Sequence, residues 1–258
     1  MKTFWLWLWL VALVGAQPSL RVTAPVLQPT LVKRYPHDPT CFTQGLVWLD
    51  SDTLLESSGL EGQSQLRRVR LSSGEVQLMR PLEDSLFAEG VAVWGQQVRL
   101  LTYQNHRYLD FELADLEVRQ QGALAFEGWG LTVSPDGRWL ASSGGSSLLW
   151  LSQDMSVAGQ LPVSEPSGPV AYLNELEWCG RRVLANVYTT ELIAVINPDN
   201  GRVECWLDLS GLLKPEEKAL ASFANGIAWN PLTHHLLVTG KYWPWLFELE
   251  IDYDIGLE

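Results

Sequence analysis

Five short segments of the chain repeat one local pattern, in which a polar or large side chain is usually followed by glycine and then by an apolar run. They cover residues 43–48, 88–93, 128–133, 173–178 and 224–229. The residues at their second position are Gln44, Glu89, Trp129, Asn174 and Asn225, which are 45, 40, 45 and 51 positions apart. A repeat of about 40–50 residues built from short strands is typical of a β-propeller, in which each repeat forms one blade.

Turn-forming sequences divide each repeat into short strands. From residue 35 onward, turn signals such as Ser72-Ser73-Gly74 recur about every 8–12 residues, a spacing typical of all-β folds. In the fourth repeat the predicted strands are 173–179, 181–188, 192–197 and 202–208. Four antiparallel strands in each of five repeats predict an all-β fold, a five-bladed β-propeller. Residues 17–33 are interpreted as a leader strand, and residues 212–221 as a single helix over one face of the ring.

The repeat also predicts which residues face one another. Equivalent positions of every blade surround the central channel of a propeller, so the second-position residues are expected to lie close together. Glycine follows that position in four repeats, at Gly45, Gly90, Gly130 and Gly226, where crowded inner strands leave no room for a side chain. Glu175 interrupts this glycine column.

The N-terminus has the features of a secretory signal peptide. Lys2 is followed by an apolar run from Phe4 to Val14, and Val14-Gly15-Ala16 resembles a small-residue cleavage site. We predict a signal peptide over residues 1–16 and a single propeller catalytic domain over 17–258, secreted or periplasmic and without a membrane anchor after cleavage. A retained N-terminal anchor is the alternative interpretation. Three cysteines leave open both a Cys179–Cys205 pair and buried free thiols.

Charge narrows the range of partners. The formal net charge is −12, and no basic cluster is present, so nucleic acid is not an expected partner. An acidic surface favours cationic ligands, including peptides with a free amino terminus. The four histidines show no zinc-ligand spacing, and the chain contains no GxSxG elbow, P-loop or dinucleotide fingerprint.

Glu89 is the one titratable residue in the central column. An acid among Phe42, Phe87 and Trp129 would be desolvated, and desolvation raises the pKa of a carboxyl group. Such a carboxyl is suited to accept and return a proton near neutral pH. The alternative is that the polar residues of the inner strands only hydrogen-bond one another and channel water. Lys241, Tyr103 and Tyr188 end strand-like runs and are candidates for the walls of the same site.

The repeated segments and the candidate site residues, taken together with their neighbours in the sequence, closely resemble the plant and bacterial type of glutaminyl-peptide cyclotransferase, also called glutaminyl cyclase. The resemblance covers residues 33 to 250 and is most specific at its first and last motifs. The matching residues are Tyr35-Pro36-His37-Asp38-Pro39, Phe42-Thr43-Gln44-Gly45-Leu46, Glu56-Ser57-Ser58-Gly59, Glu89-Gly90, Thr102-Tyr103-Gln104-Asn105, Glu127-Gly128-Trp129-Gly130-Leu131, Leu173-Asn174-Glu175-Leu176-Glu177-Trp178, Asn186-Val187, Asn225-Gly226-Ile227-Ala228 and Val238-Thr239-Gly240-Lys241.

The resemblance implies a five-bladed propeller that cyclises an N-terminal glutamine to pyroglutamate and releases ammonia. The family's catalytic carboxyl corresponds to Glu89, and its pocket residues correspond to Phe42, Gln44, Phe87, Trp129, Asn174 and Lys241. Tyr103 and Tyr188 stand where the family usually has tryptophan. The usual Ser-Asp-Gly after the third inner strand reads Ser143-Gly144-Gly145, which puts a structural metal at that position in doubt.

From these residues we expect the following roles. Glu89 transfers protons, Gln44 and Lys241 stabilise the oxyanion, and the aromatic residues with Asn174 and Asn225 bind the substrate. No cofactor is required and no metal site is predicted, although a structural metal stays open. The expected partners are peptides or proteins with N-terminal glutamine, and the chain is expected to be a monomer. The alternatives are a metal-dependent propeller hydrolase of the lactonase kind and a non-catalytic secreted propeller that binds other proteins.

Overall fold

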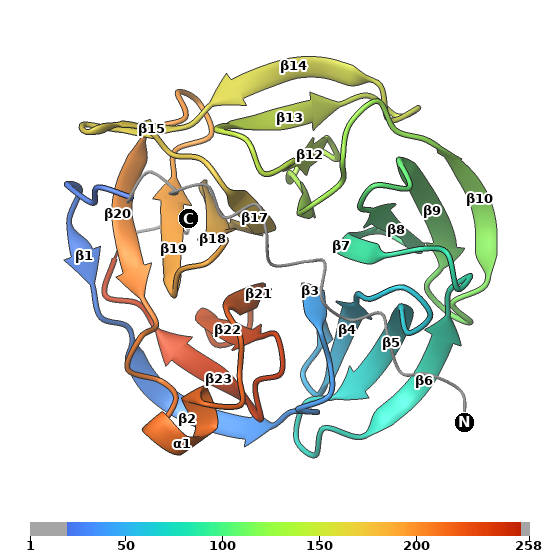
Figure 1. Ribbon diagram of the computed structural model, residues 1–258, viewed down its shortest axis with the longest axis horizontal. Coiled ribbons are helices and arrows are strands. Elements are labelled where there is room, and N and C mark those ends of the chain that lie inside the picture. The colour runs from blue at the N-terminus through green and yellow to red at the C-terminus, as the bar shows by residue number, and fades with distance from the viewer. Residues whose placement is uncertain (1–19, 254–258) are drawn as a thin grey trace, which may run out of the picture.

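Five small antiparallel sheets are arranged around a central axis in the computed structural model of the chain, as Figure 1 shows. The structure describes residues 20–253. The predicted all-β, five-bladed propeller is confirmed. The predicted signal peptide, residues 1–16, lies outside the described residues.

Each sheet contains four blade strands, and the innermost strand is the first of its repeat in the sequence. Blade 1 contains β3 (Thr43–Asp50), β4 (Thr53–Ser58), β5 (Gln65–Arg70) and β6 (Val76–Pro81). Blade 2 contains β7 (Ala88–Trp94), β8 (Gln97–Thr102), β9 (Arg107–Glu112) and β10 (Val118–Ala123). Blade 3 contains β11 (Leu131–Val133), β12 (Trp139–Ala141), β13 (Ser147–Leu151) and β14 (Val157–Pro162), and a small hairpin of β15 (Ser164–Glu165) and β16 (Gly168–Pro169) follows it.

The last two blades confirm the strand predictions and show how the ring closes. Blade 4 contains β17 (Leu173–Cys179), β18 (Arg182–Val187), β19 (Leu192–Ile196) and β20 (Val203–Asp208), with β1 (Val26–Leu27) added in parallel to β20. Blade 5 contains β21 (Ala224–Asn230), β22 (His235–Gly240) and β23 (Trp245–Glu250), and its outer strand is β2 (Thr30–Pro36). The leader segment therefore supplies the outer strand of the last blade, and the ring is closed by pairing between the two ends of the described chain.

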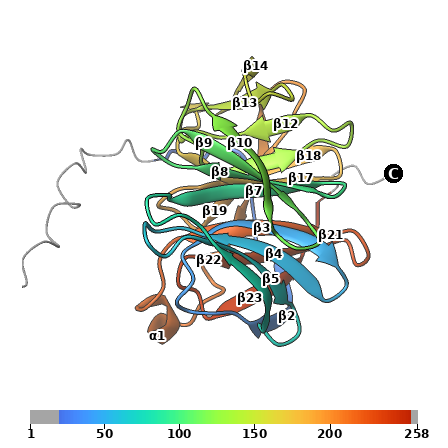
Figure 2. The same cartoon turned by 90° about the vertical axis from the view of Figure 1, so that its right-hand side faces the viewer.

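The helix lies within the predicted residues 212–221 but is shorter. Helix α1 (Pro215–Lys218) lies at the edge of the ring in Figure 1 and projects from the rest of the fold at the lower left of Figure 2. The Trp245 indole Nε1 donates a hydrogen bond of 2.7 Å to Glu217 Oε1, which attaches α1 to blade 5. No helix among residues 20–253 combines the length and apolar character needed to cross a membrane.

The hydrophobic core is divided into five clusters, one at each junction between neighbouring blades. Leu55 and Val91, for example, belong to the cluster between blades 1 and 2, whereas Leu46 and Ala228 belong to the one between blades 1 and 5. Cys41, Cys179 and Cys205 are buried free thiols, so of the two open interpretations the structure supports unpaired cysteines.

The glycine column permits the inner strands to approach closely, as predicted. A Cβ at Gly90 would lie 2.5 Å from Leu131 N, and one at Gly130 would lie 2.0 Å from Asn174 O. Neither distance is sterically possible. This close approach brings the second-position residues of the five repeats to the ring's centre.

Candidate active site

Two sets of equivalent positions meet at one rim of the channel. One set precedes the inner strand of each blade by a residue or two, and it includes Phe42, Phe87 and Phe223. The other set follows the second strand, and it includes Tyr103, Tyr188 and Lys241. The sets lie together because the start of each inner strand pairs with the end of the second strand, as in Ala88 with Thr102 and Ala224 with Gly240.

Seven aromatic rings form a continuous arc at this rim. Neighbouring rings meet edge to face with centroids 5.3–6.3 Å apart, a favourable geometry for aromatic pairs. In order along the arc, the rings are Tyr242, Phe42, Phe87, Tyr103, Trp129, Tyr188 and Phe223. All seven are half-buried, so the arc keeps an accessible side.

Five rings of the arc were predicted from the sequence, and Phe223 and Tyr242 were not. A signal for Phe223 exists, because it stands two residues before Asn225 as Phe42 stands two before Gln44. Tyr242 has no such repeat signal. It lies in a left-handed turn (φ +62°) directly after Lys241, which the periodicity of the strands does not encode.

The predicted central residues form a hydrogen-bonded relay beside the arc. Asn225 Nδ2 donates to Gln44 Oε1 at 2.8 Å and to Thr43 O at 3.1 Å. Because the carbonyl of the Gln44 amide is thereby occupied, its Nε2 is directed to Glu89 Oε1 at 3.1 Å. Gln44, Glu89 and Asn225 are all buried. The relay therefore holds a hydrogen-bond donor in place against the carboxyl group of Glu89.

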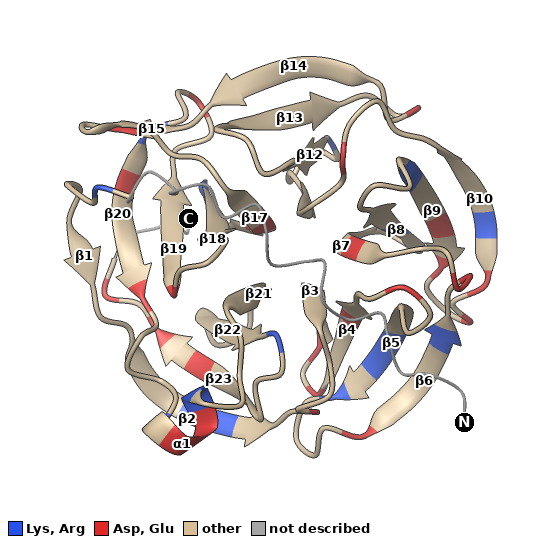
Figure 3. Cartoon of the chain, in the orientation of Figure 1, with Lys and Arg blue, Asp and Glu red and all other residues tan. Residues whose placement is uncertain are grey.

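Glu89 and Lys241 have opposing charges, and burial weakens the ionisation of both. Desolvation raises the pKa of Glu89 well above its ordinary value, while the nearby Lys241 charge lowers it and Glu127 raises it further. Desolvation lowers the pKa of Lys241 to about 8, against the raising effect of Glu89. Lys241 Nζ lies 4.4 Å from the centroid of Phe42 and 5.2 Å from that of Tyr188, so its ammonium lies between two rings of the arc. Figure 3 shows an acidic inner end of β7 and a basic segment in the loop after β22.

Several polar atoms of the inner strands have no hydrogen-bond partner among the described residues. Trp129 Nε1, Asn174 Oδ1 and Asn225 Oδ1 are fully buried and unpaired. Buried polar atoms in proteins are nearly always hydrogen-bonded, so these three unpaired atoms are candidate contacts for a bound molecule. Together they supply one donor and two acceptors within the predicted set of site residues.

Glycine at position 144 permits the position of the Trp129 indole. Gly144 has a φ of +74°, and a Cβ there would lie 2.7 Å from Cζ2 of Trp129. The sequence comparison pointed to a missing aspartate at this position. In the structure, the small residue allows the backbone to lie against the largest ring of the arc.

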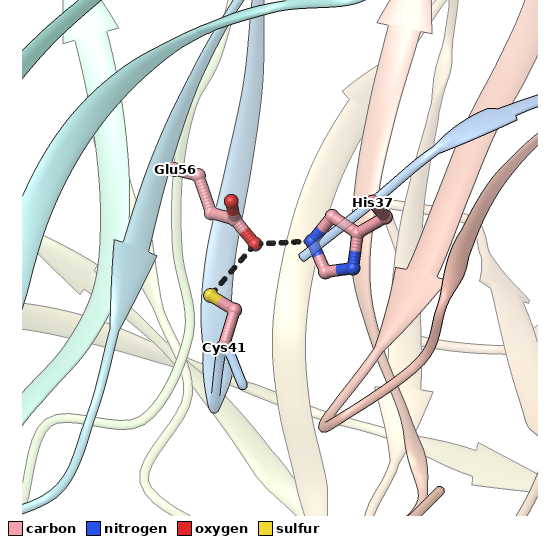
Figure 4. Close-up of side chains that lie close together, drawn as sticks. All are labelled: His37, Cys41 and Glu56. Carbon is pink, nitrogen blue, oxygen red and sulfur yellow. Dashed lines mark hydrogen bonds and ion pairs between the residues drawn. The ribbon is translucent and has the colours of Figure 1, made fainter. Parts of the chain in front are cut away.

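A buried polar cluster that was absent from the predictions contacts the loop after Lys241. Figure 4 shows His37, Cys41 and Glu56 around one carboxylate oxygen. Glu56 Oε1 accepts hydrogen bonds from His37 Nε2 at 2.8 Å and from Thr43 Oγ1 at 2.7 Å, and the Cys41 thiol lies 3.1 Å away. Arg67 forms an ion pair of 2.9 Å with Oε2 of the same carboxylate.

The cluster ties blade 1 to the loop that carries Lys241. His37 Nδ1 donates to Trp243 O at 2.7 Å, and Tyr242 N donates to Cys41 O at 2.8 Å. Because Trp243 O and Glu56 can only accept, both ring nitrogens of His37 carry protons. Burial opposes this charge, but Glu56 keeps the pKa of His37 raised, and His37 and Arg67 keep the pKa of Glu56 lowered despite its burial.

The residue types His37, Cys41 and Glu56 are those of metal sites, and their ligand atoms lie within 4.8 Å of one another. The donor set does not fit a cation, however. Both histidine nitrogens donate hydrogen bonds, and the guanidinium of Arg67 already neutralises the carboxylate. The cluster therefore has the chemistry of a structural ion-pair network.

Comparisons with known proteins agree with the sequence resemblance. The model of the glutamine cyclotransferase family matches residues 6–251. A glutaminyl-peptide cyclotransferase from Arabidopsis thaliana is 35% identical over 240 residues, which cover 90% of this chain and 74% of that protein. The crystal structure of Myxococcus xanthus glutaminyl cyclase superposes with a TM-score of 0.78 at 28% identity, covering 88% of this chain and 98% of that one. The chain belongs to the glutamine cyclotransferase family of enzymes.

Proposed function

We propose that the chain converts the N-terminal glutamine of peptides or proteins to pyroglutamate, with Glu89 as the group that moves the proton. The observation that carries the proposal is one desolvated carboxyl, held by the Gln44 amide and facing the Lys241 charge beside an aromatic arc. Membership of the glutamine cyclotransferase family supports the reaction class.

The reaction is an intramolecular acyl transfer. The α-amino nitrogen of the substrate attacks the carbonyl carbon of its own γ-carboxamide, a C–N bond forms, and the bond to the amide nitrogen breaks. The amine is largely protonated at neutral pH, because its ordinary pKa is about 7.7–8.0. The amide nitrogen must in turn gain a proton to leave as ammonia. One group able to take and return a proton therefore serves both steps.

Glu89 has the properties that such a shuttle needs. Since burial raises its pKa, its carboxylate is a strong enough base to accept a proton from the substrate ammonium, and its carboxylic acid then protonates the departing nitrogen. The Gln44 donor keeps the carboxyl oriented during both transfers. General acid–base help of this kind is typically worth about 10²–10⁴-fold.

Positioning and oxyanion stabilisation supply the remaining acceleration. The arc holds the aliphatic part of the glutamine side chain in the folded conformer that brings nitrogen and carbonyl together, and such orientation effects reach effective molarities of about 10⁵ M or more. The Lys241 ammonium and the unpaired Trp129 indole N–H are the donors for the oxyanion. Asn174 and Asn225 bind the substrate through their unpaired carbonyl oxygens.

The proposal includes three further expectations. The reaction needs no cofactor, the enzyme acts as a monomer, and cleavage of residues 1–16 releases it to the periplasm or the exterior. The test is ammonia release from a short amidated Gln-Ala peptide, with the matching Asn-Ala peptide as control and with a chelator in a parallel reaction. We expect ammonia and the cyclised peptide only from the glutamine substrate, with or without chelator. Absence of release, or its loss with the chelator, would refute the proposal.

A further inference from the structure

A cavity of about 360 Å³ adjoins the aromatic arc at Tyr188. Tyr188 belongs to both features, because its ring packs against Trp129 and Phe223 and also lines the cavity. Tyr188 therefore links the cavity to the site, since Lys241 Nζ lies 5.2 Å from the centroid of the same ring. The volume of the cavity lies at the lower end of the range of ligand pockets, roughly 300–1,000 Å³, and is suited to a short stretch of peptide.

The cavity lies between blade 4 and the segment that precedes β1. Leu20 and Arg21 form one wall, the β15–β16 hairpin with Ser167 and Pro169 forms another, and the loop after β18 forms the third. These walls come from parts of the chain about 150 residues apart. The sequence repeat does not predict this cavity, because residues 20–21 lie outside the repeats.

Hydrogen bonds fix the segment that carries Arg21. The carboxylate oxygen Oε2 of Glu165 accepts bonds from Thr23 N at 3.0 Å and Ala24 N at 3.2 Å, and also from the Trp206 indole at 3.1 Å. The hydroxyl of Ser167 lies 2.6 Å from Arg21 O and also contacts Glu165 Oε1. The backbone at Arg21 is thus attached to the hairpin that forms the neighbouring wall.

The guanidinium of Arg21 has no ion-pair partner in residues 20–253. Glu165, the buried acid in this network, directs Oε2 to backbone amides and the Trp206 indole and Oε1 to the Ser167 hydroxyl instead. Most other arginines of the described chain contact a carboxylate, as Arg182 does with Glu204 at 2.6 Å. Arg21 is therefore an exposed, unpaired cation at the wall of a cavity in a chain whose net charge is −12.

Acidic and basic groups lie on different sides of the aromatic arc. Glu89 and the half-buried Glu127 lie on the side of blades 2 and 3, where they attract the amino terminus of a peptide, whereas Arg21 lies beyond Tyr188 on the side of blade 4. A peptide whose first residue reaches Glu89 would continue past Tyr188 into the cavity. An extended chain advances by about 3.3–3.6 Å per residue, so a peptide bound this way would place the residues just after the first one in the cavity that Arg21 lines.

We propose that this cavity binds the residues that follow the N-terminal glutamine, and that Arg21 selects substrates with an acidic residue there. The inference rests on the proposed cyclase function and names its preferred substrate class. An exposed ion pair is worth at most about 1 kcal/mol, or about fivefold. Since Arg21 attracts an aspartate and repels a lysine, we expect the specificity ratio between the two to be about threefold to tenfold at low ionic strength.

The experiment compares kcat/KM for amidated Gln-Ala-Ala-Ala peptides in which aspartate or lysine replaces each alanine in turn. The wild type is expected to prefer aspartate at one or two adjacent positions, and this preference should fade at about 1 M salt, where the Debye length is about 3 Å. In Arg21→Glu the ratio of aspartate to lysine substrates should fall below one. The control Arg181→Glu makes the same charge change in the β17–β18 turn, at the opposite end of the blade 4 strands, and should keep the wild-type ratio.

Binding of the same peptides to Glu89→Gln, followed by tryptophan fluorescence, tests the cavity without turnover. A wild-type ratio near one at every position, or the same ratio in Arg21→Glu as in the wild type, would overturn the proposal about Arg21 and leave the cyclase function standing. Failure of the all-alanine glutamine peptide to release ammonia would instead refute the cyclase function itself.

Discussion

The replacement Glu89→Gln separates the chemistry of the site from its packing. Glutamine has nearly the same shape as glutamate, and its carbonyl can still accept the 3.1 Å hydrogen bond from Gln44 Nε2. The ability to exchange a proton is lost. We expect turnover to fall by at least about 10²–10⁴-fold, which corresponds to about 3–5 kcal/mol of transition-state stabilisation.

The same variant should not be less stable than the wild type. Burial raises the folded-state pKa of Glu89, so the wild type loses stability as the pH rises from the ordinary carboxyl pKa of 4.5 towards that raised value, because the unfolded chain ionises there while the desolvated carboxyl stays protonated. Glu89→Gln has no such cost, and its free energy of unfolding should therefore exceed that of the wild type at pH 8–9. Urea denaturation across pH measures this difference.

Glu177→Gln is the matched control. Desolvation raises the pKa of Glu177 to about 8, and its Oε1 accepts a 2.8 Å bond from Trp229 N on the neighbouring blade, away from the aromatic arc. This variant should keep most of the turnover. The reasoning is refuted if Glu89→Gln releases ammonia at a rate close to wild type while remaining folded, or if both variants lose activity equally.

Three further predictions concern the surroundings of Glu89. Lys241→Ala should reduce kcat at least about tenfold. In the wild type, kcat should decline as the pH rises through about 8, where Lys241 loses its proton. Lys241→Arg should remove that decline, and a wild-type pH profile in this variant would contradict the assignment of Lys241. Glu56→Gln leaves the buried His37 without its counter-ion and leaves Arg67 paired with Asp38 alone, and it should lower the free energy of unfolding by about 3–5 kcal/mol at pH 7, a difference that shrinks as the pH falls below 4.5 towards the lowered pKa of Glu56. Cys41→Ala removes only a weak donor and should cost far less in the same urea titration. Gly144→Ala places a methyl group 2.7 Å from the Trp129 ring and should lower turnover and shift tryptophan fluorescence, whereas Gly145→Ala, which meets no atom within 4 Å, should do neither.

The sequence predicts the parts of this molecule that follow the repeat. Gln44, Glu89 and Asn225 were expected to meet because they occupy one position of successive blades, and crowding at Gly90 and Gly130 explains why that position faces the centre. The strands of blade 4 were placed to within a residue at most of their ends. The periodicity of the sequence is sufficient to place these strands, because equivalent strands pack in the same way in every blade.

Features formed by residues outside the repeat were not predictable in this way. The outer strand of blade 5 comes from residues 30–36, a pairing that depends on ring closure rather than on local pattern. The cluster of His37, Glu56 and Arg67 joins a loop and two strands, and the dipeptide His37-Asp38 carried no sign of it. Tyr242 enters the arc through a left-handed turn, and Arg21 reaches its cavity through anchoring by Glu165.

The protonation of Glu89 itself tests the central claim most directly. Difference infrared spectra between wild type and Glu89→Gln isolate the carbonyl stretch of this one carboxylic acid as the pH is raised. We predict that the signal persists well above the ordinary carboxyl pKa of 4.5 and persists to still higher pH in Lys241→Ala, because the ammonium that lowers the pKa is removed. A signal that disappears near pH 4.5 in both proteins would contradict the account.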